Sequence, residues 1–493
     1  MNYGSLFRYK DMKKRILCLI GLLLFFHNAN AQLTLKEAIN RSITTNKGIE
    51  AARKSVEAKT NTVQSAYGRY FPNINFDITY NYIDRDIIID LSPIRSAMIS
   101  LQANNQVGFS NLESLLKTGS PLTAEQQLAI KQGAIEKLNN AIPEFEKTLK
   151  ERAFPKATFS INQPIFTGGK ISAGVDASKA QKELELKKLD GEKAEIVSQV
   201  IISYINVLIA EENLQVRQDA LKTIEKHKER AEGMLKQGLI APHDKLRADV
   251  AYSEAKRNVF EAEEKLKIAK IALSSLLNNY EVSQLAEKIQ YKTVEQSVDY
   301  FIELAKNNNP LLEQIRYGAK ALDAKANAEM ANYFPTIYGF GMYDVFDHYR
   351  SAIDPKWAVG IGASFTIFNG MRRTNDYQAA KAESESYYSL AEEIERKIEL
   401  AVRNFYMEMK LAENSYLMLE DAVEQATENL RLNEKRYETG LGTSIEVLDA
   451  ELSLEAIKLK RNNALKEYFS NLAQICKINN NNDYFLNIWG KNN

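Results

Sequence analysis

The chain has 493 residues, 45% of them apolar and 26% charged, and its 64 basic side chains balance its 64 acidic ones. This length allows a large buried core in about three domains, and the zero net charge excludes nucleic acid as a bulk electrostatic partner, because no basic excess is available to neutralise phosphates. With only 22 glycines and 10 prolines and a mean hydropathy of −0.36, the chain also falls outside the collagen-like and low-complexity disordered classes, which leaves a folded, largely helical protein.

The N-terminus has the three parts of a secretory signal. Basic residues at 13–15 precede an apolar run at 16–26, and an A-x-A site ends at Ala31. We therefore predict that residues 1–31 are a signal peptide, cleaved between Ala31 and Gln32. The apolar run is too short for a membrane anchor, which needs about 20 residues. No later segment approaches 18 consecutive apolar residues, so no transmembrane helix is predicted, and an exported periplasmic protein or a β-barrel is expected.

The sequence repeats itself. Residues 67–74 (YGRYFPNI) return at 330–337 (MANYFPTI), and residues 163–170 (QPIFTGGK) return at 365–372 (FTIFNGMR). The first pair is offset by 263 residues and the second by 202. Because the offset changes only once, the two halves share one design, and the first half carries about 60 additional residues.

Each half is predicted to read helix, strand, strand, long helix, turn, long helix. The repeats cover 32–280 and 281–478, with the insert at 84–153 and a C-terminal tail at 479–493. The expected strands are about 71–83, 154–166, 334–346 and 356–368, and the expected long helices are 170–237, 243–279, 371–438 and 443–476.

The strand prediction rests on alternation. Between Asn73 and Tyr82 apolar and aromatic residues fill one face, and residues 357–367 repeat the pattern. Aromatic residues gather at the strand ends, as they do at a membrane interface. The alternative is a half-buried sheet of a soluble protein.

The helix prediction rests on long stretches without breakers. Residues 371–439 contain neither Gly nor Pro, and such a stretch makes a helix of roughly 100 Å at ~1.5 Å per residue. A coiled-coil seam with 3-4-3 spacing is expected at Leu465, Tyr468, Leu472 and Ile475.

Four strands are too few for a membrane barrel formed by one chain. Outer-membrane barrels have at least about eight strands, and an open sheet would leave unpaired edges in lipid. If the sheet lies in a membrane, several chains must share one barrel. Two chains would give eight strands and three would give twelve, and strand counting does not decide between them.

Along residues 33–478 the chain resembles the TolC family of outer-membrane efflux ducts. The matching motifs are the Phe-Pro junctions at Pro72 and Pro335, the strand-to-helix turns at 164–169 and 367–370, and the hairpin tip YETGLGTSIEVLDA at 437–450. The resemblance implies a mainly α fold with a membrane β part, in which a homotrimer shares one twelve-stranded barrel and a periplasmic α-barrel of long coiled-coil helices. It also implies a place in the lipid of the outer membrane, and a role as exit duct for an inner-membrane pump joined by a periplasmic adaptor.

In this family acidic residues of the tip helix line the periplasmic constriction, and the matching positions are Glu446 and Asp449. They are spaced i, i+3, so a trimer would present six carboxylates that attract cations and raise one another's pKa. Glu446 also completes a capping box with Thr443, so capping, the constriction or both are expected of it. Asp449 has no such structural role and is expected to face the lumen.

The resemblance further implies a gate lock within one chain between Asp244 and Tyr437. Asp244 is the repeat equivalent of Glu446. On this basis Asp244→Ala or Tyr437→Phe is expected to raise channel conductance. The sequence departs from the family at Gly442, where TolC carries an arginine that forms part of the lock.

The two hairpin tips are expected to contact the adaptor. Gly238 and Gly440 suit the left-handed residue that ends a helix, and Pro242 suits the first turn of the next. The expected docking residues are Gly238, Leu239, Ile240, Ala241, Gly440, Leu441, Gly442 and Thr443.

The insert is expected at the outer mouth of the barrel, with a helical, charged part at 123–150. A loop expansion without function is the favoured interpretation, and a fold over the mouth or a contact with a surface partner is the alternative.

No enzyme or cofactor is predicted. His227, His243 and His348 are isolated, without metal-ligand spacing, and the sequence contains no nucleophile elbow, P-loop or dinucleotide motif. Two alternatives to an efflux duct remain: a type I protein-secretion duct of the same fold, and a soluble periplasmic coiled-coil scaffold.

Overall fold

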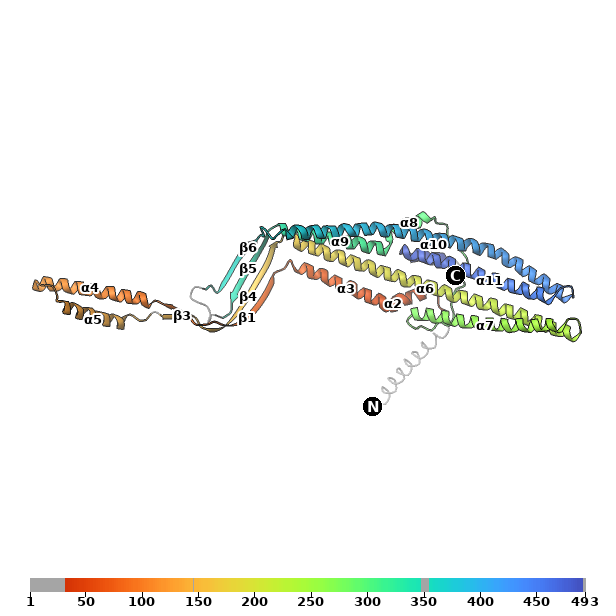
Figure 1. Cartoon of the computed structure of the whole chain (residues 1–493), viewed down its shortest axis with the longest axis horizontal. Coiled ribbons are helices and arrows are strands. Elements are labelled where there is room, and N and C mark those ends of the chain that lie inside the picture. The colour runs from red at the N-terminus through yellow and green to blue at the C-terminus, as the bar shows by residue number, and fades with distance from the viewer. Residues whose placement is uncertain (1–31, 145, 347–353, 491–493) are drawn as a thin grey trace, which may run out of the picture. The chain divides into compact units, whose positions relative to one another are not determined.

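The computed structural model describes residues 32–144, 146–346 and 354–490. The predicted signal peptide at 1–31 therefore lies outside the described residues, as does His348. Contacts divide the chain into two compact units (Figure 1). The helical unit comprises the described residues up to 66, 173–327 and those from 375 onward, and the sheet unit comprises 67–172 and 328–374. The division cuts across the sequence repeats, because each repeat supplies helices to one unit and strands to the other.

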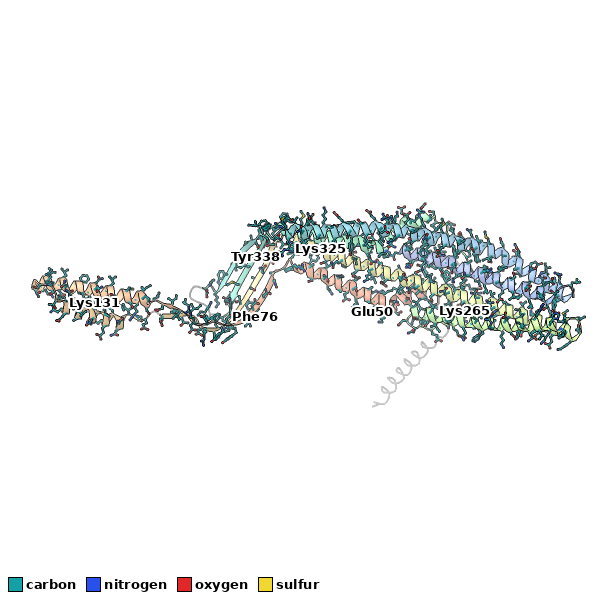
Figure 2. The ribbon with its side chains drawn as sticks, viewed as in Figure 1. Glu50, Phe76, Lys131, Lys265, Lys325 and Tyr338 are labelled. Atoms are coloured by element: carbon teal, nitrogen blue, oxygen red, sulfur yellow. The ribbon has the colours of Figure 1, made fainter. Side chains whose placement is uncertain are left out.

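The sheet unit contains one antiparallel sheet of four strands among its described residues. These are β1 (Asn73–Tyr82), β4 (Ala153–Phe166), β5 (Thr336–Asp344) and β6 (Trp357–Ser364), in the order β1-β4-β5-β6. Phe76 of β1 pairs with Phe159 of β4, and Gly339 of β5 pairs with Ile361 of β6. Figure 2 labels Phe76 and Tyr338 on this sheet. Within the described chain β1 and β6 are edge strands.

The fourth strand ends earlier than the predicted 356–368. The last pair of the β5–β6 ladder is Thr336 with Ser364. Pro335 precedes Thr336 and has no N–H to offer a ladder. Phe365 and Ile367 continue the alternation in sequence but lie beyond the strand with exposed side chains. The alternating sequence pattern therefore overestimated the length of this strand.

The helical unit is dominated by four long helices that run alongside one another in Figure 1. They are α6 (Lys170–Lys236), α7 (Pro242–Leu276), α10 (Arg372–Glu438) and α11 (Ser444–Ile478). The shorter helices are α2 (Leu35–Thr45), α3 (Lys47–Gly68), α8 (Val298–Asn308), α9 (Pro310–Met330) and α12 (Asn482–Gly490). With 67 residues each, α6 and α10 are about 100 Å long at ~1.5 Å per residue.

The core of the helical unit contains the predicted seam of α11. Leu465, Tyr468, Leu472 and Ile475 are all buried. The predicted tail at 479–493 is not a simple tail, because Phe485 and Trp489 of α12 are buried against the same core.

No transmembrane helix was predicted from the sequence. An 18-residue stretch of α6 is nevertheless long and apolar enough to cross a membrane, by length and composition alone. Its apolar side chains, among them Val200, Ile201 and Ile205, are buried in the core of the helical unit. We therefore assign this stretch to packing between helices.

The insert at 84–153 is a folded hairpin. Strand β2 (Ile87–Asp90) pairs with β3 (Glu146–Lys150), and helix α4 (Ser92–Thr118) packs on α5 (Ala124–Ala141). A helix over 123–150 was predicted, but α5 ends at Ala141, just before Pro143, which disfavours a helical conformation at the residue before it. Helix α4 was not predicted.

Candidate functional site

The two hairpin tips of the helical unit have the same backbone geometry. Gly238 and Gly440 adopt left-handed conformations, with φ of +72° and +75°. The closing hydrogen bonds also correspond, since Leu239 N–H donates to Met234 O at 2.9 Å and Leu441 N–H donates to Arg436 O at 2.8 Å. The repeat in the sequence is therefore a repeat of one helix-ending motif.

The two tips differ at the start of the following helix. At the α10–α11 tip, Thr443 N–H donates to Glu446 Oε2 at 2.7 Å, and Glu446 N–H donates to Thr443 Oγ1 at 3.3 Å. At the α6–α7 tip the N-cap is Ala241, which has no side-chain cap, so Asp244 has no equivalent role. Glu446 therefore does act as a helix cap.

The electrostatic environment of Glu446 favours its ionised form. The hydrogen bond from the Thr443 backbone lowers its pKa, and the positive charge of Arg436 acts in the same direction. Arg436 Nη1 lies 3.7 Å from Glu446 Oε1. A place in a constriction remains a prediction for Glu446 and for Asp449, which is exposed in the single chain.

Tyr437 and Asp244 lie near each other, but no hydrogen bond joins them in the described part of the chain. Tyr437 is 2% exposed, and its hydroxyl is buried without a hydrogen-bond partner among the described residues. Burial raises the pKa of Tyr437, and the negative charge of Asp244 raises it further. The Asp244 carboxylate lies 3.5 Å from His243 Nε2. The expected pairing is therefore electrostatic rather than a direct bond.

A buried histidine, His227, connects the two hairpins. In the sequence it had been interpreted as isolated. His227 of α6 is 3% exposed, its Nε2 lies 2.7 Å from Ser444 Oγ of α11, and its ring lies 4.8 Å from the ring of Tyr437. Burial, followed by the positive charge of Arg230, lowers the pKa of His227 to about 4. The ring is therefore neutral at physiological pH.

The sequence did contain a signal for His227. It occupies a coiled-coil seam position, between buried residues at 4-3-4 spacing: Ala220, Ile224, His227 and Ala231. A search for metal-ligand spacing could not detect it, because its partners lie on distant helices.

Further polar contacts link α6 to the other hairpin. Arg230 pairs with Glu438 at 2.6 Å, Arg217 pairs with Glu455, and Asn462 Nδ2 donates to Asn213 Oδ1 at 2.9 Å. Together with His227–Ser444 we call these the inter-hairpin contacts. They connect the two hairpins of one chain from His227 and Arg230, close to the tips, back to Asn213 and Asn462, which lie 25 and 22 residues from the tip glycines Gly238 and Gly440.

The departure at Gly442 has a steric reason. A Cβ at this position would lie 3.0 Å from Tyr437 N and 3.1 Å from Arg436 Cβ. A larger side chain would require the end of α10 to shift. The nearby cation comes instead from Arg436, which also donates to Leu441 O at 3.3 Å.

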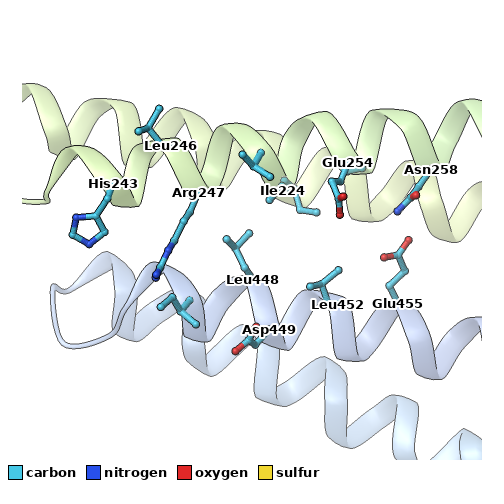
Figure 3. A pocket seen from close by; sticks show the side chains of 14 residues that line it. Ile224, His243, Leu246, Arg247, Glu254, Asn258, Leu448, Asp449, Leu452 and Glu455 are labelled. Carbon is cyan, nitrogen blue, oxygen red and sulfur yellow. The ribbon is translucent and has the colours of Figure 1, made fainter.

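An open cavity of about 670 Å³ lies between α7 and α11 (Figure 3). Its apolar lining includes Leu246 and Val250 of α7 and Leu452 of α11. Arg247 points from α7 toward α11, and Asp449 lies at the α11 side. Asp449 is exposed and borders this open cavity in the single chain.

The predicted docking residues are accessible at both tips. Leu239 and Leu441, which correspond by the 202-residue offset, are 65% and 76% exposed. Gly238, Gly440 and Thr443 are also exposed, whereas Ile240, Ala241 and Gly442 are half-buried. Among the described residues no group of three His, Cys, Asp or Glu side chains is placed to hold a metal ion.

Comparison with known proteins places this geometry in context. The sequence profile of the family described as "Outer membrane efflux protein" matches residues 149–279 and 301–481. The chain is 24% identical over 396 residues to the cobalt-zinc-cadmium resistance protein CzcC of Cupriavidus metallidurans, and the match covers 73% of this chain and 91% of that protein.

Solved structures share the fold. The outer membrane protein VceC of Vibrio cholerae matches with a TM-score of 0.66 and 15% identity, over 90% of this chain and 96% of that chain. The open state of the MtrE outer membrane channel of Neisseria gonorrhoeae matches with a TM-score of 0.64 and 16% identity, over 90% of this chain and 88% of that chain. The predicted fold class, mainly helical with few strands, is confirmed.

Proposed function

The chain belongs to the outer membrane efflux protein family, and from this premise we propose how it assembles and conducts. The family resemblance, the outer-membrane location and the efflux role predicted from the sequence are thereby confirmed. The family and its structural neighbours are transport channels. We propose that three copies share one twelve-stranded barrel and one periplasmic helical tube, and that the protein conducts substrates without catalysing a reaction or using a cofactor.

The observation that carries this proposal is the exposed apolar face of the sheet. Five apolar or aromatic side chains of β1 are exposed on one face: Ile74, Phe76, Ile78, Tyr80 and Tyr82. The alternate residues, such as Asn75, Asp77 and Thr79, are polar. An apolar face suits lipid and a polar face suits a water-filled lumen. The unpaired edges at β1 and β6 require strands from other copies, because a bilayer does not satisfy backbone groups.

The proposed gate lies at the hairpin tips. Glu446 and Asp449 of three copies would form an acidic ring, which favours the passage of cations. The inter-hairpin contacts would hold the ring narrow, and their rupture would widen it. Both carboxylate oxygens of Glu446 are near a partner, so Asp449 is the freer of the two to meet a passing ion.

The proposed partners are a periplasmic adaptor and an inner-membrane pump. Leu239 and Leu441 expose apolar side chains at corresponding tip positions, and three copies would present six such positions in a ring. Exposed apolar side chains on otherwise polar tips favour a protein contact. The adaptor would bind there and connect the duct to the pump.

The cargo that we propose is divalent metal cations. Two observations support it: the relative CzcC carries the name of a cobalt-zinc-cadmium resistance protein, and the proposed constriction is acidic. Export of a protein through the same fold is the alternative.

A deletion strain tests this function. Loss of the gene should sensitise cells to zinc, cobalt or cadmium, and the full-length chain should restore growth. Purified protein in planar bilayers should form cation-selective channels. Unchanged metal tolerance together with loss of a secreted protein would support the secretion duct. Full recovery of the protein from cells without detergent would favour the soluble scaffold.

A further inference from the structure

Helix α4 of the insert carries an apolar stripe on its outer face. Six large apolar side chains of this helix are between 52% and 78% exposed: Ile94, Met98, Leu101, Phe109, Leu112 and Leu116. They recur at spacings of four, three, eight, three and four residues, and Asn105 divides the spacing of eight into two of four. At about 100° per residue, all seven positions lie within about 80° of the helix circumference.

The opposite face of α4 is already covered by α5. Ile99 and Ala103, about half a turn away from the stripe, are buried. Arg95 ties the two helices together by donating to Ile142 O and to Asn139 O. Leu122 N–H, between the helices, donates to Asn111 Oδ1 at 2.8 Å. The hairpin is therefore a defined unit, and no described residue buries the stripe.

Leaving this stripe in water is costly. Because each of the six side chains is more than half exposed, together they present roughly a few hundred Å² of apolar surface to water, and the free-energy cost of hydrating apolar surface grows with its area. An area of this size is comparable to that of the largest apolar patch on a typical monomer, which is often functional. It is also a substantial part of the ~800 Å² per partner in a stable interface.

Three features indicate that other copies of the same chain cover the stripe. Asn105 lies within the stripe. A single Asn buried between helices fixes the register of a coiled coil, whereas an Asn that faces lipid would leave its amide without hydrogen-bond partners. Helix α4 has only three charged residues, Arg95, Glu113 and Lys117, and the last two form an ion pair with each other. Parallel copies therefore meet without strong like-charge repulsion.

The third feature is continuity with the sheet edge. Nine residues separate the end of the edge strand β1 from the start of α4. Nine residues span at most about 30 Å. Copies that join through the edge of β1 therefore bring their α4 helices to the same region.

We infer that the α4 helices of three copies pack through this stripe as a parallel three-helix coiled coil at the outer mouth of the duct. The inference rests on the proposed function, because it takes the three copies as given. It assigns the insert an assembly role, in place of the loop expansion without function that the sequence favoured.

Site-specific cross-linking of the full-length protein in intact cells tests this inference. Leu101→Cys places a thiol in the stripe, and Leu128→Cys places one at an exposed leucine of α5 as a matched control. The native Cys476 is buried and does not compete. A short three-armed maleimide should convert most Leu101→Cys chains into covalent trimers and leave Leu128→Cys chains as monomers.

Native electrophoresis of the same samples separates the possible failures. Leu101→Cys chains that stay uncross-linked, form only dimers or attach to another protein, while the native trimer persists, would overturn the coiled coil and leave the proposed function intact. Absence of the trimer itself would overturn the proposed function first.

Discussion

His227 of α6 and Ser444 of α11 lie 2.7 Å apart in the interior of the helical unit, although 217 residues separate them in sequence. The contact joins one hairpin to the first turn of the other, directly beside the proposed gate. Burial of the ring favours the neutral form of His227, so protonation would place a charge in the interior beside the proposed gate.

Acidification should destabilise the closed arrangement through His227. Its pKa in the folded chain is lowered from 6.5 to about 4, so the stability that it contributes is present above pH 6.5 and is lost as the pH falls toward 4. His227→Gln retains a hydrogen-bonding group without this titration. Thermal unfolding of the purified protein between pH 7 and pH 4 should show a smaller loss of stability for the variant. Identical pH profiles of the variant and the parent protein would show that titration of His227 does not cause the loss of stability in acid.

Titration of Glu451 should have the opposite effect on stability, which should fall as the pH rises. Its side chain is buried with one carboxylate oxygen unpartnered among the described residues, and burial raises its pKa from 4.5 to about 7. The charged groups that act on it are Lys458, Glu455, Glu434 and Asp219. Since the folded pKa is raised, the stabilising contribution is present below pH 4.5 and is lost as the pH rises through 7.

Glu451→Gln removes this titration. The variant should unfold at a higher temperature than the parent protein at pH 8 and at about the same temperature at pH 5. A variant that is less stable than the parent at pH 8 would show that the ionised carboxylate is stabilising in the fold.

The ion pair between Arg230 and Glu438 should affect conduction more than stability. Both side chains are more than 40% exposed, and such pairs contribute about 0–1 kcal/mol. Arg230→Ala should therefore leave the unfolding temperature nearly unchanged and raise the single-channel open probability, because the pair crosses between hairpins. Lys236→Ala, which breaks an ion pair within α6 at the same tip, is the control. Equal effects of both variants on conduction would contradict a specific role for the inter-hairpin pair.

The structure revises the expectation for Tyr437. The sequence favoured a lock that Tyr437→Phe would weaken, but the hydroxyl has no hydrogen-bond partner in the part of the chain that is described. Tyr437→Phe should therefore leave conductance unchanged, whereas Tyr437→Ala removes the ring that packs on His227 and should raise it. Conductance recordings in planar bilayers distinguish the two, and an increase in the Phe variant would restore the original expectation.

The exposed leucines of the tips should govern adaptor binding. Leu239→Asp combined with Leu441→Asp replaces two apolar contacts by charges and should abolish co-purification of the adaptor without dissolving the trimer. Gln218→Asp adds the same kind of charge at an exposed position of α6 away from the tips. Normal adaptor recovery with the double variant would exclude these residues from the docking surface.

Features of the fold that depend on residues close together in the sequence were predictable, and those that depend on distant residues were not. Helix lengths, the seam at Tyr468 and the alternation of β1 are properties of short sequence windows, so periodicity and repeat offsets located them. The early end of β6 depends on Pro335, which precedes the neighbouring strand β5, so the sequence of β6 alone does not show where its pairing stops.

The polar contacts of the gate were less predictable for the same reason. The capping box at Thr443 and Glu446 is local and was recognised. The contact of His227 with Ser444 depends on two distant helices and was missed. Helix α4 was overlooked because its apolar stripe has no internal partner and was not sought in a presumed loop.

Electron microscopy of the mature protein, purified from outer membranes in detergent, tests the central claim most directly. We expect threefold particles with a twelve-stranded barrel and a long helical tube that ends in six hairpin tips. Particles without threefold symmetry, or a sheet that stays open in single chains, would contradict it.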